Sequence, residues 1–148
     1  MRPAGTGMVL GAALLAMAMH LPGASAEGAL AFGTTGDLGK DGFAFGYAND
    51  WKTREKAMAE AMKQCYAQSN QAQRAAALCK VVATYRQECF ALAFDPEVGK
   101  PGVGWALAPD EETAKQRAIA VCEITAGKDR MQFCKVSSFY CDTSDTRE

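Results

Sequence analysis

Histidine is almost absent from this sequence: its one instance, His20, lies in a segment that we expect to be removed. Without it, a Ser-His-Asp triad or a Cys-His nucleophile cannot be assembled, because both use an imidazole as the general base. The missing histidine and the lack of any Cys-x-x-Cys pair also argue against zinc and thioredoxin-like redox sites. We assign no catalytic or metal-binding residue from the sequence and expect no cofactor.

A block of like charge is missing as well. The 16 basic and 17 acidic side chains give a formal net charge of −1, whereas proteins that bind nucleic acid or anionic lipid carry clusters of lysine and arginine. Long apolar runs are also lacking, since the longest, residues 8–19, is shorter than the roughly 20 residues that span a bilayer. We expect no nucleic-acid partner and a chain that does not span the membrane.

Residues 1–26 have the layout of a secretory signal peptide. An arginine gives a positive start, the apolar run 8–19 follows, and Ala-Ser-Ala at 24–26 offers the small-x-small pattern that signal peptidase reads. Cleavage there would begin the mature chain at Glu27. Residues 27–148 have the length of one compact domain, so we predict a single exported domain that is periplasmic or secreted.

Residues 28–141 contain an internal repeat. Each copy has Ala-Leu-Ala-Phe, then a glycine followed by an aromatic residue, then a helix-forming segment ending in cysteine and a Cys-Lys-Val segment. The first two matching pieces are 29–32 with 91–94, and 42–43 with 104–105. We place repeat one at about 28–89 and repeat two at about 90–141.

Small residues at helical spacing predict one helix in each copy. The two stripes are Ala57, Met58, Ala61, Met62 and Cys65, and Ala114, Ala118, Ile119, Val121 and Cys122. Asp110 is a favourable N-cap and Gly127 a favourable stop for the second helix. The stretch 70–78 is longer than its counterpart and predicts an extra helical turn.

The remaining short apolar runs carry the aromatic and β-branched residues of strands, so each copy is predicted to run strand-strand-helix-strand. We expect the two copies to merge into one antiparallel or mixed sheet with both helices packed on it. The predicted fold is therefore α+β, pseudo-symmetric and stabilised by disulfides.

An even number of cysteines in a small exported chain predicts three disulfides, although spacing alone leaves 15 connectivities. The repeat narrows these, because equivalent cysteines should have equivalent partners unless bridges cross between copies. The resulting pairs are Cys65–Cys79, Cys122–Cys134 and Cys89–Cys141. Only the last pair would tie one copy to the other.

The ordered pattern of residues 28–141 resembles the domain-of-unknown-function 4189 family of small exported bacterial domains. The segments that carry the resemblance are Ala-Leu-Ala-Phe, Gly-Phe-Ala-Phe-Gly-Tyr-Ala, Cys-Lys-Val-Val, Glu-Cys-Phe-Ala-Leu-Ala, Gly-Trp-Ala and two alanine-rich helices ending in cysteine. The resemblance implies a fold and export, and it brings no established activity.

The glycine-rich segment 33–42 resembles ligand loops only superficially. Gly33 and Gly39 do not have the Walker spacing, and aspartate follows the lysine where serine or threonine is needed. The segment also starts like an EF-hand loop, but Ala48 stands where the bidentate glutamate belongs. We interpret it as a flexible hairpin connection.

Two pairs of residues leave catalysis open as an alternative. Lys135 and Ser137 could share a strand face, and Asp95 with Glu97 could supply paired carboxylates of the kind that glycoside hydrolases use. Residues 110–112 are also acidic, but helix capping accounts for them.

The two tryptophans differ in their predicted roles. Trp105 occupies the repeat position of Phe43, so core packing accounts for it. Trp51 has no counterpart and lies in the polar segment 49–52, where it is either a partner contact or a hydrophobic staple. We predict that Trp51 contacts a partner.

We predict a non-enzymatic exported binding domain of the bacterial envelope, with an inhibitor or immunity-type protein as its most specific version. Its partner would be an envelope protein or a cell-wall component. The alternatives are a small envelope hydrolase that uses carboxylates or a Ser-Lys pair, and a purely structural envelope protein. The sequence leaves the oligomeric state open.

Overall fold

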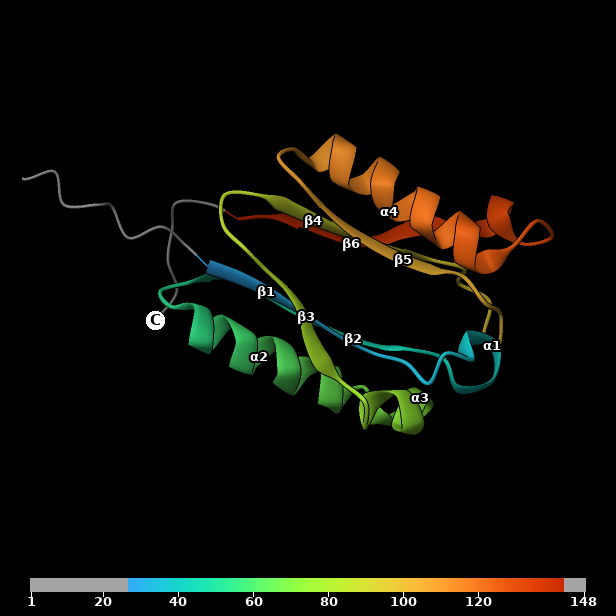
Figure 1. The fold of residues 1–148 in the computed structure, drawn as a ribbon. Helices are drawn as coiled ribbons and strands as arrows, with labels where there is room; N and C mark the ends of the chain where they lie inside the picture. Colours follow the sequence, from blue (N-terminus) through green and yellow to red (C-terminus); the bar gives the residue numbers. More distant parts are fainter. Residues whose placement is uncertain (1–26, 143–148) are drawn as a thin grey trace, which may run out of the picture.

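Two three-stranded antiparallel sheets stack face to face, and each carries one long helix on its outer side (Figure 1). This computed structural model describes residues 27–142, so the predicted signal peptide at 1–26 lies outside the described residues. The α+β class is as predicted, but the prediction of one continuous sheet is wrong. The two halves pack through the apolar faces of their sheets, which removes those faces from water without pairing strand edges.

The first sheet has the strand order β2-β1-β3. Its elements are β1 (Glu27–Gly33), α1 (Leu38–Asp41), β2 (Ala44–Trp51), α2 (Arg54–Ala67), α3 (Ser69–Ala76) and β3 (Lys80–Tyr85). The first strand of this half therefore lies in the centre, and the helix α2 packs across β1 and β2.

The second sheet has the order β5-β4-β6, again with its first strand in the centre. Its elements are β4 (Cys89–Phe94), β5 (Val103–Ala108), α4 (Glu111–Ala126), the 3₁₀ helix η1 (Met131–Phe133) and β6 (Lys135–Cys141). The halves thus match in strand order, while the duplication itself stays a prediction.

Small residues allow each long helix to lie close to its sheet. The buried helix positions repeat every four residues, and they are Ala57, Ala61 and Cys65 in α2 and Ala114, Ala118, Cys122 and Ala126 in α4. Beneath them, a Cβ added at Gly46 or Gly104 would overlap the helix backbone. Val121, which we expected in the buried stripe, is 40% exposed because it lies off this four-residue line.

The strand register shows which residue of the first half corresponds to Trp105 of the second half. Ala31 pairs with Gly46, and Ala93 pairs with Gly104. Trp105 therefore occupies the position of Tyr47, and the predicted match with Phe43 is wrong. The paired residues Ala31 and Gly46 are also further apart in the sequence than Ala93 and Gly104, so the first half has additional residues between its first two strands.

The connection between β1 and β2 is more ordered than the predicted flexible hairpin. Asp37 caps the short helix α1, since its Oδ1 accepts a hydrogen bond from the Lys40 backbone N–H at 3.0 Å. Asp41 then pairs with Arg74 of α3, with 3.5 Å between Oδ1 and the guanidinium nitrogen. The predicted extra turn after α2 is the eight-residue helix α3.

All three predicted cysteine pairs are bonded in the structure: Cys65–Cys79, Cys122–Cys134 and Cys89–Cys141. The first two join a helix to the start of the strand that follows it. The third has a different role from the one we predicted, because Cys89 is the first residue of β4 and pairs with Cys141 of β6. This bridge therefore lies within the second sheet and does not tie the halves together.

Candidate functional site

Trp51 is the last residue of β2, and the prediction that it lies in a loop is corrected by the strand pairing. Trp51 pairs with Glu27, whereas Ala48 pairs with Ala29, so β2 contains one extra residue, a β-bulge, between them. The bulge includes Asp50, whose φ of 60° is rare for a residue with a side chain. The Trp51 side chain is half-buried against the alanine core beneath α2.

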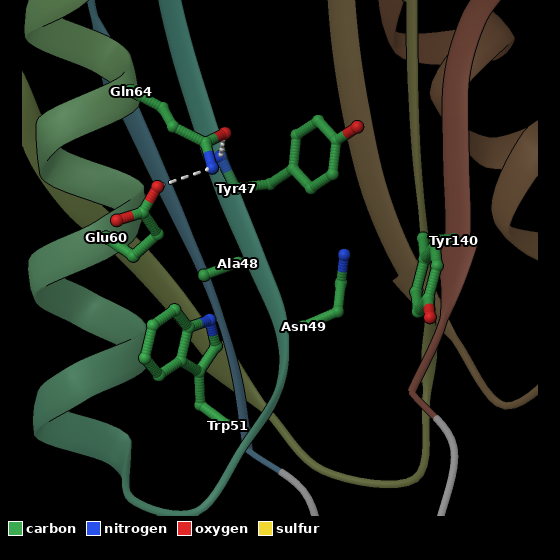
Figure 2. A pocket seen from close by; sticks show the side chains of 7 residues that line it. All are labelled: Tyr47, Ala48, Asn49, Trp51, Glu60, Gln64 and Tyr140. Carbon is green, nitrogen blue, oxygen red and sulfur yellow. Dashed lines mark hydrogen bonds between the residues drawn. The ribbon is translucent and has the colours of Figure 1, made fainter. Parts of the chain in front are cut away.

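A cavity of about 290 Å³ lies beside Trp51, on the side of the molecule where β2 faces β6 (Figure 2). We call it the Trp51 pocket. Seven residues line it: Tyr47, Ala48, Asn49 and Trp51 of β2, Glu60 and Gln64 of α2, and Tyr140 of β6. Three aromatic rings and three amide or carboxylate groups therefore meet in one small space.

Asn49 is bonded at one end of its amide and open at the other. The Tyr85 hydroxyl donates to Asn49 Oδ1 and lies 3.2 Å from the Ala48 carbonyl oxygen. No described residue accepts a hydrogen bond from Asn49 Nδ2, which points into the space between Tyr47 and Tyr140 in Figure 2. The side chain is only 8% exposed. Among the described residues, buried side-chain atoms without a hydrogen-bond partner occur at Glu27 Oε2 and Asp142 Oδ1. Asn49 Nδ2 is instead open to the cavity, where water or a ligand can accept its hydrogen bond.

Gln64 forms a fixed wall of the pocket. Its Nε2 donates to Glu60 Oε1 at 3.1 Å, and its Oε1 accepts from the Tyr47 backbone N–H at 3.4 Å (Figure 2). In the same way, Gln68 Oε1 accepts a hydrogen bond from the Phe45 backbone N–H at 3.2 Å. These glutamines occupy backbone donors on the outer edge of β2, which would otherwise be available to another strand. The wall is thus held in place before any ligand arrives.

Behind the pocket, two carboxyl groups and two tyrosines form a network. The Tyr140 hydroxyl donates to Asp50 Oδ2 at 2.5 Å. Burial raises the pKa of the neighbouring Asp142, the Asp50 charge adds to the rise, and the Gln87 N–H, 2.9 Å from Oδ2, opposes it. Burial likewise raises the pKa of Tyr85, which therefore stays a hydrogen-bond donor. The network fixes the orientation of Tyr140 and Asn49.

Backbone strain is concentrated in the same network. Among the described residues, Asp50 and Gln87 are the non-glycine residues with a positive φ, at 60° and 54°. Such conformations cost of order 1–3 kcal/mol each and persist where the surroundings enforce them, commonly at functional sites. Strain at both residues marks this end of the molecule as a candidate functional region.

The carboxylates singled out from the sequence have structural partners instead. Arg130 lies 2.7 Å from both Asp95 and Glu97, and its hydrogen bond lowers the pKa of Asp95. Asp110 caps α4 by accepting from the Thr113 backbone N–H at 2.8 Å, which lowers its pKa. None of these groups lines the Trp51 pocket.

The Ser-Lys candidate also lacks an arrangement for catalysis. Lys135 and Ser137 are exposed positions of β6, and no hydrogen bond joins them. Within residues 27–142, no group of three histidine, cysteine, aspartate or glutamate side chains is arranged to hold a metal ion. No helix in the same range is long and apolar enough to cross a membrane.

The sequence analysis missed several residues that line the pocket or support it from outside. Tyr85 and Tyr140 each stand five positions after the lysine of a Cys-Lys-Val segment, so extending the repeat comparison would have found them. Asn49 carried no signal, because its role depends on the bulge and on Tyr85. Gln64 and Gln68 are one helical turn apart, which is the only sign that they share a face.

The fold and the pocket define a disulfide-bonded, two-sheet α+β domain with a small aromatic and amide-lined cavity. This chain belongs to the family described as Domain of unknown function (DUF4189), whose model matches residues 28–141. The match runs from β1 to the end of β6. Comparison with curated proteins found no match, and comparison with solved structures found none either.

Proposed function

We propose that this protein is a non-enzymatic exported binding domain of the bacterial envelope, and that the Trp51 pocket holds its ligand. The observation that carries the proposal is the Asn49 amide: its side chain is largely buried, and its nitrogen faces the cavity without a protein acceptor. Tyr85 and Gln64 hold the surrounding groups in fixed positions. A preorganised wall of this kind lowers the entropic cost of binding.

Two further features support the envelope as the place of action. The segment 1–26 has the composition of an export signal. Three disulfides are typical of small domains in oxidising compartments, where they persist. The proposed location is therefore the periplasm or the medium, and the proposed partner is an envelope protein or a cell-wall component. An inhibitor or immunity-type role is the most specific form of this proposal.

Capture from an envelope extract tests this function. The protein, immobilised with its disulfides intact, is expected to retain a partner, and Trp51→Ala should weaken capture at least tenfold, as loss of an aromatic anchor does. Tyr66→Ala is the control, because Tyr66 is a half-exposed aromatic residue of α2, the helix that follows Trp51, and does not line the pocket. Equal capture by the wild type and Trp51→Ala would contradict the proposal.

A hydrolase is the second candidate, and one observation favours it. Asp142 lies beside Asp50 and has a pKa that burial raises, and a carboxyl group with a raised pKa is a common feature of general-acid sites. Release of dye from labelled peptidoglycan, abolished by Asp142→Asn, would support hydrolysis. Binding without release by the wild-type protein would leave the binding function as the correct one.

A further inference from the structure

We infer that the Trp51 pocket takes a neutral pyranose ring of an envelope glycan. This inference rests on the proposed function, since it names the class of ligand for the same cavity. It follows from three features of the pocket: the aromatic rings that face it, the polar atoms left open in it, and its size.

The three aromatic rings come from two strands, β2 and β6, and each is held in place by a neighbouring group. The Tyr47 ring lies 4.7 Å from the Phe90 ring, centroid to centroid, and Phe90 is fully buried between the sheets. Trp51 packs on the core beneath α2, and Tyr140 is held through its hydroxyl by Asp50. Aromatic faces pack against apolar surfaces at little entropic cost. The C–H faces of a pyranose ring are surfaces of this kind.

The open polar atoms match the hydroxyl groups of a sugar. Asn49 Nδ2 is a donor without a described acceptor, and the half-buried Tyr47 has a hydroxyl for which no hydrogen bond is formed within residues 27–142. Glu60 supplies a carboxylate whose only ionic partner among these residues is the exposed Lys63, at 3.5 Å. Each sugar hydroxyl both donates and accepts, so an amide donor beside a carboxylate acceptor can bind neighbouring hydroxyls.

The charge and polarity of the pocket disfavour anionic and purely apolar ligands. Its seven lining residues include no lysine or arginine, and Glu60 is negative, so phosphate and carboxylate groups would be repelled. A purely apolar ligand would leave Asn49 Nδ2 without an acceptor, which costs about 1–3 kcal/mol. A neutral ligand with many hydroxyl groups satisfies both conditions.

The size of the pocket suits one ring of a longer chain. Its volume of about 290 Å³ is at the lower end of the roughly 300–1,000 Å³ of small-molecule clefts. Tyr47 also borders a second cavity of about 640 Å³, which extends between Phe45 of the first sheet and Leu92 of the second. A ring seated beside Trp51 therefore has space next to it for a linked sugar.

Titration with defined sugars tests the inference. The disulfide-intact protein is titrated with soluble oligomers of N-acetylglucosamine and of glucose, and binding is followed by tryptophan fluorescence and calorimetry. We expect saturable binding that Trp51→Ala weakens at least tenfold. Tyr47→Phe should weaken it several-fold with an unchanged melting temperature, because its hydroxyl has no protein partner. Tyr66→Ala, outside the pocket, should bind like the wild type.

Co-sedimentation with two insoluble or micellar glycans identifies the source of the sugar. Purified peptidoglycan sacculi and lipopolysaccharide are compared, and Trp51-dependent retention by either one supports the inference and names its source. The sugar assignment is overturned if no glycan binds, or if binding is unaffected by Trp51→Ala.

A different result would separate this inference from the proposed function. Saturable binding of a tyrosine- or tryptophan-containing tripeptide, with no sugar binding, would overturn the glycan assignment in favour of a peptide ligand. Trp51-dependent capture of an envelope protein without sugar binding would likewise overturn it, while the proposed function would stand. Loss of both sugar binding and Trp51-dependent capture would overturn both.

Discussion

Asn49 depends on one hydroxyl group for its orientation. Its side chain is buried, and Tyr85 of β3 holds its oxygen, which leaves the nitrogen for the cavity. The Tyr85 ring lies directly over Gly28, where any side chain would overlap it. A glycine in β1, a tyrosine in β3 and an asparagine in β2 therefore act together, although they lie far apart in the sequence.

Removal of the Tyr85 hydroxyl should disturb both stability and binding. Tyr85→Phe leaves Asn49 Oδ1 without its donor in a buried position, so the free energy of unfolding should fall by about 1–3 kcal/mol. Urea unfolding measures this change. Ligand affinity should fall too, because the amide is no longer fixed. A variant with wild-type stability would show that the hydroxyl has no structural role.

Asp142 should make the protein less stable as pH rises. Its pKa in the folded state is raised above the ordinary 3.8, mainly by burial, so the charged form is disfavoured by folding. The stability associated with the protonated carboxyl is complete below the ordinary pKa and is lost as pH rises through the folded-state pKa. Asp142→Asn stays neutral and should become more stable relative to wild type between pH 3 and pH 7.

Urea unfolding of both proteins across this range measures the difference. Asp95 and Asp110 have lowered pKa values, so they stabilise the fold above the ordinary pKa and lose that effect in acid. This opposite contribution is the same in both proteins and cancels in the comparison. A difference in unfolding free energy that does not vary with pH would contradict the role of Asp142.

At the scale of elements, the close packing of α2 on β2 positions the pocket. Gly46 lies beneath the helix backbone at Ala61 and Cys65, so the helix can approach the strand closely. That approach brings Gln64 within hydrogen-bond distance of the Tyr47 N–H. The pocket wall thus follows from a glycine that has no side chain in the pocket.

Gly46→Ala should destabilise the protein and weaken binding together. The added Cβ overlaps the Ala61 carbonyl oxygen, so α2 must move away, at a cost of about 1–3 kcal/mol or more. Gly39→Ala is the control, because its Cβ would meet no atom closer than 3.6 Å. Thermal unfolding compares the two variants, and equal melting temperatures would contradict the close approach of α2.

Sequence patterns predicted elements better than their assembly. The helix starting at Asp110 was found from its cap and its alanine spacing, both of which are local. The β-bulge before Trp51 could not be predicted, because it shows itself only as a shift in pairing with β1. Trp51 therefore looked like a loop residue, although it ends a strand.

At the scale of the whole molecule, the sequence-based prediction of one sheet was wrong, because the strands form two stacked sheets. Strand patterns indicate which face of a strand is apolar, and both one large sheet and two stacked sheets bury such faces. The choice depends on which strands lie at the edges, here β2, β3, β5 and β6. The cleft between β2 and β6 exists only in the two-sheet arrangement, so the pocket could not be predicted.

The two disulfides that join a long helix to the strand after it should contribute strongly to stability. Cys65–Cys79 closes a loop with a sequence separation of 14, and Cys122–Cys134 one of 12. Replacing both cysteines of either pair with serine should lower the free energy of unfolding by about 3 kcal/mol. Chemical denaturation measures the loss, and peptide mapping without reductant checks the remaining bridges. A free thiol in the wild-type protein would contradict this pairing.

The most direct test of the binding account is chemical-shift mapping of the ¹⁵N-labelled protein during titration with the soluble, neutral oligomers of N-acetylglucosamine and of glucose. The account predicts that the largest shifts occur at the Trp51 pocket, in Tyr47, Asn49, Trp51, Gln64 and Tyr140. Exposed apolar residues of α4, such as Ile124, should not shift. Absence of any shift, or shifts confined to α4, would contradict the claim that this pocket binds a sugar.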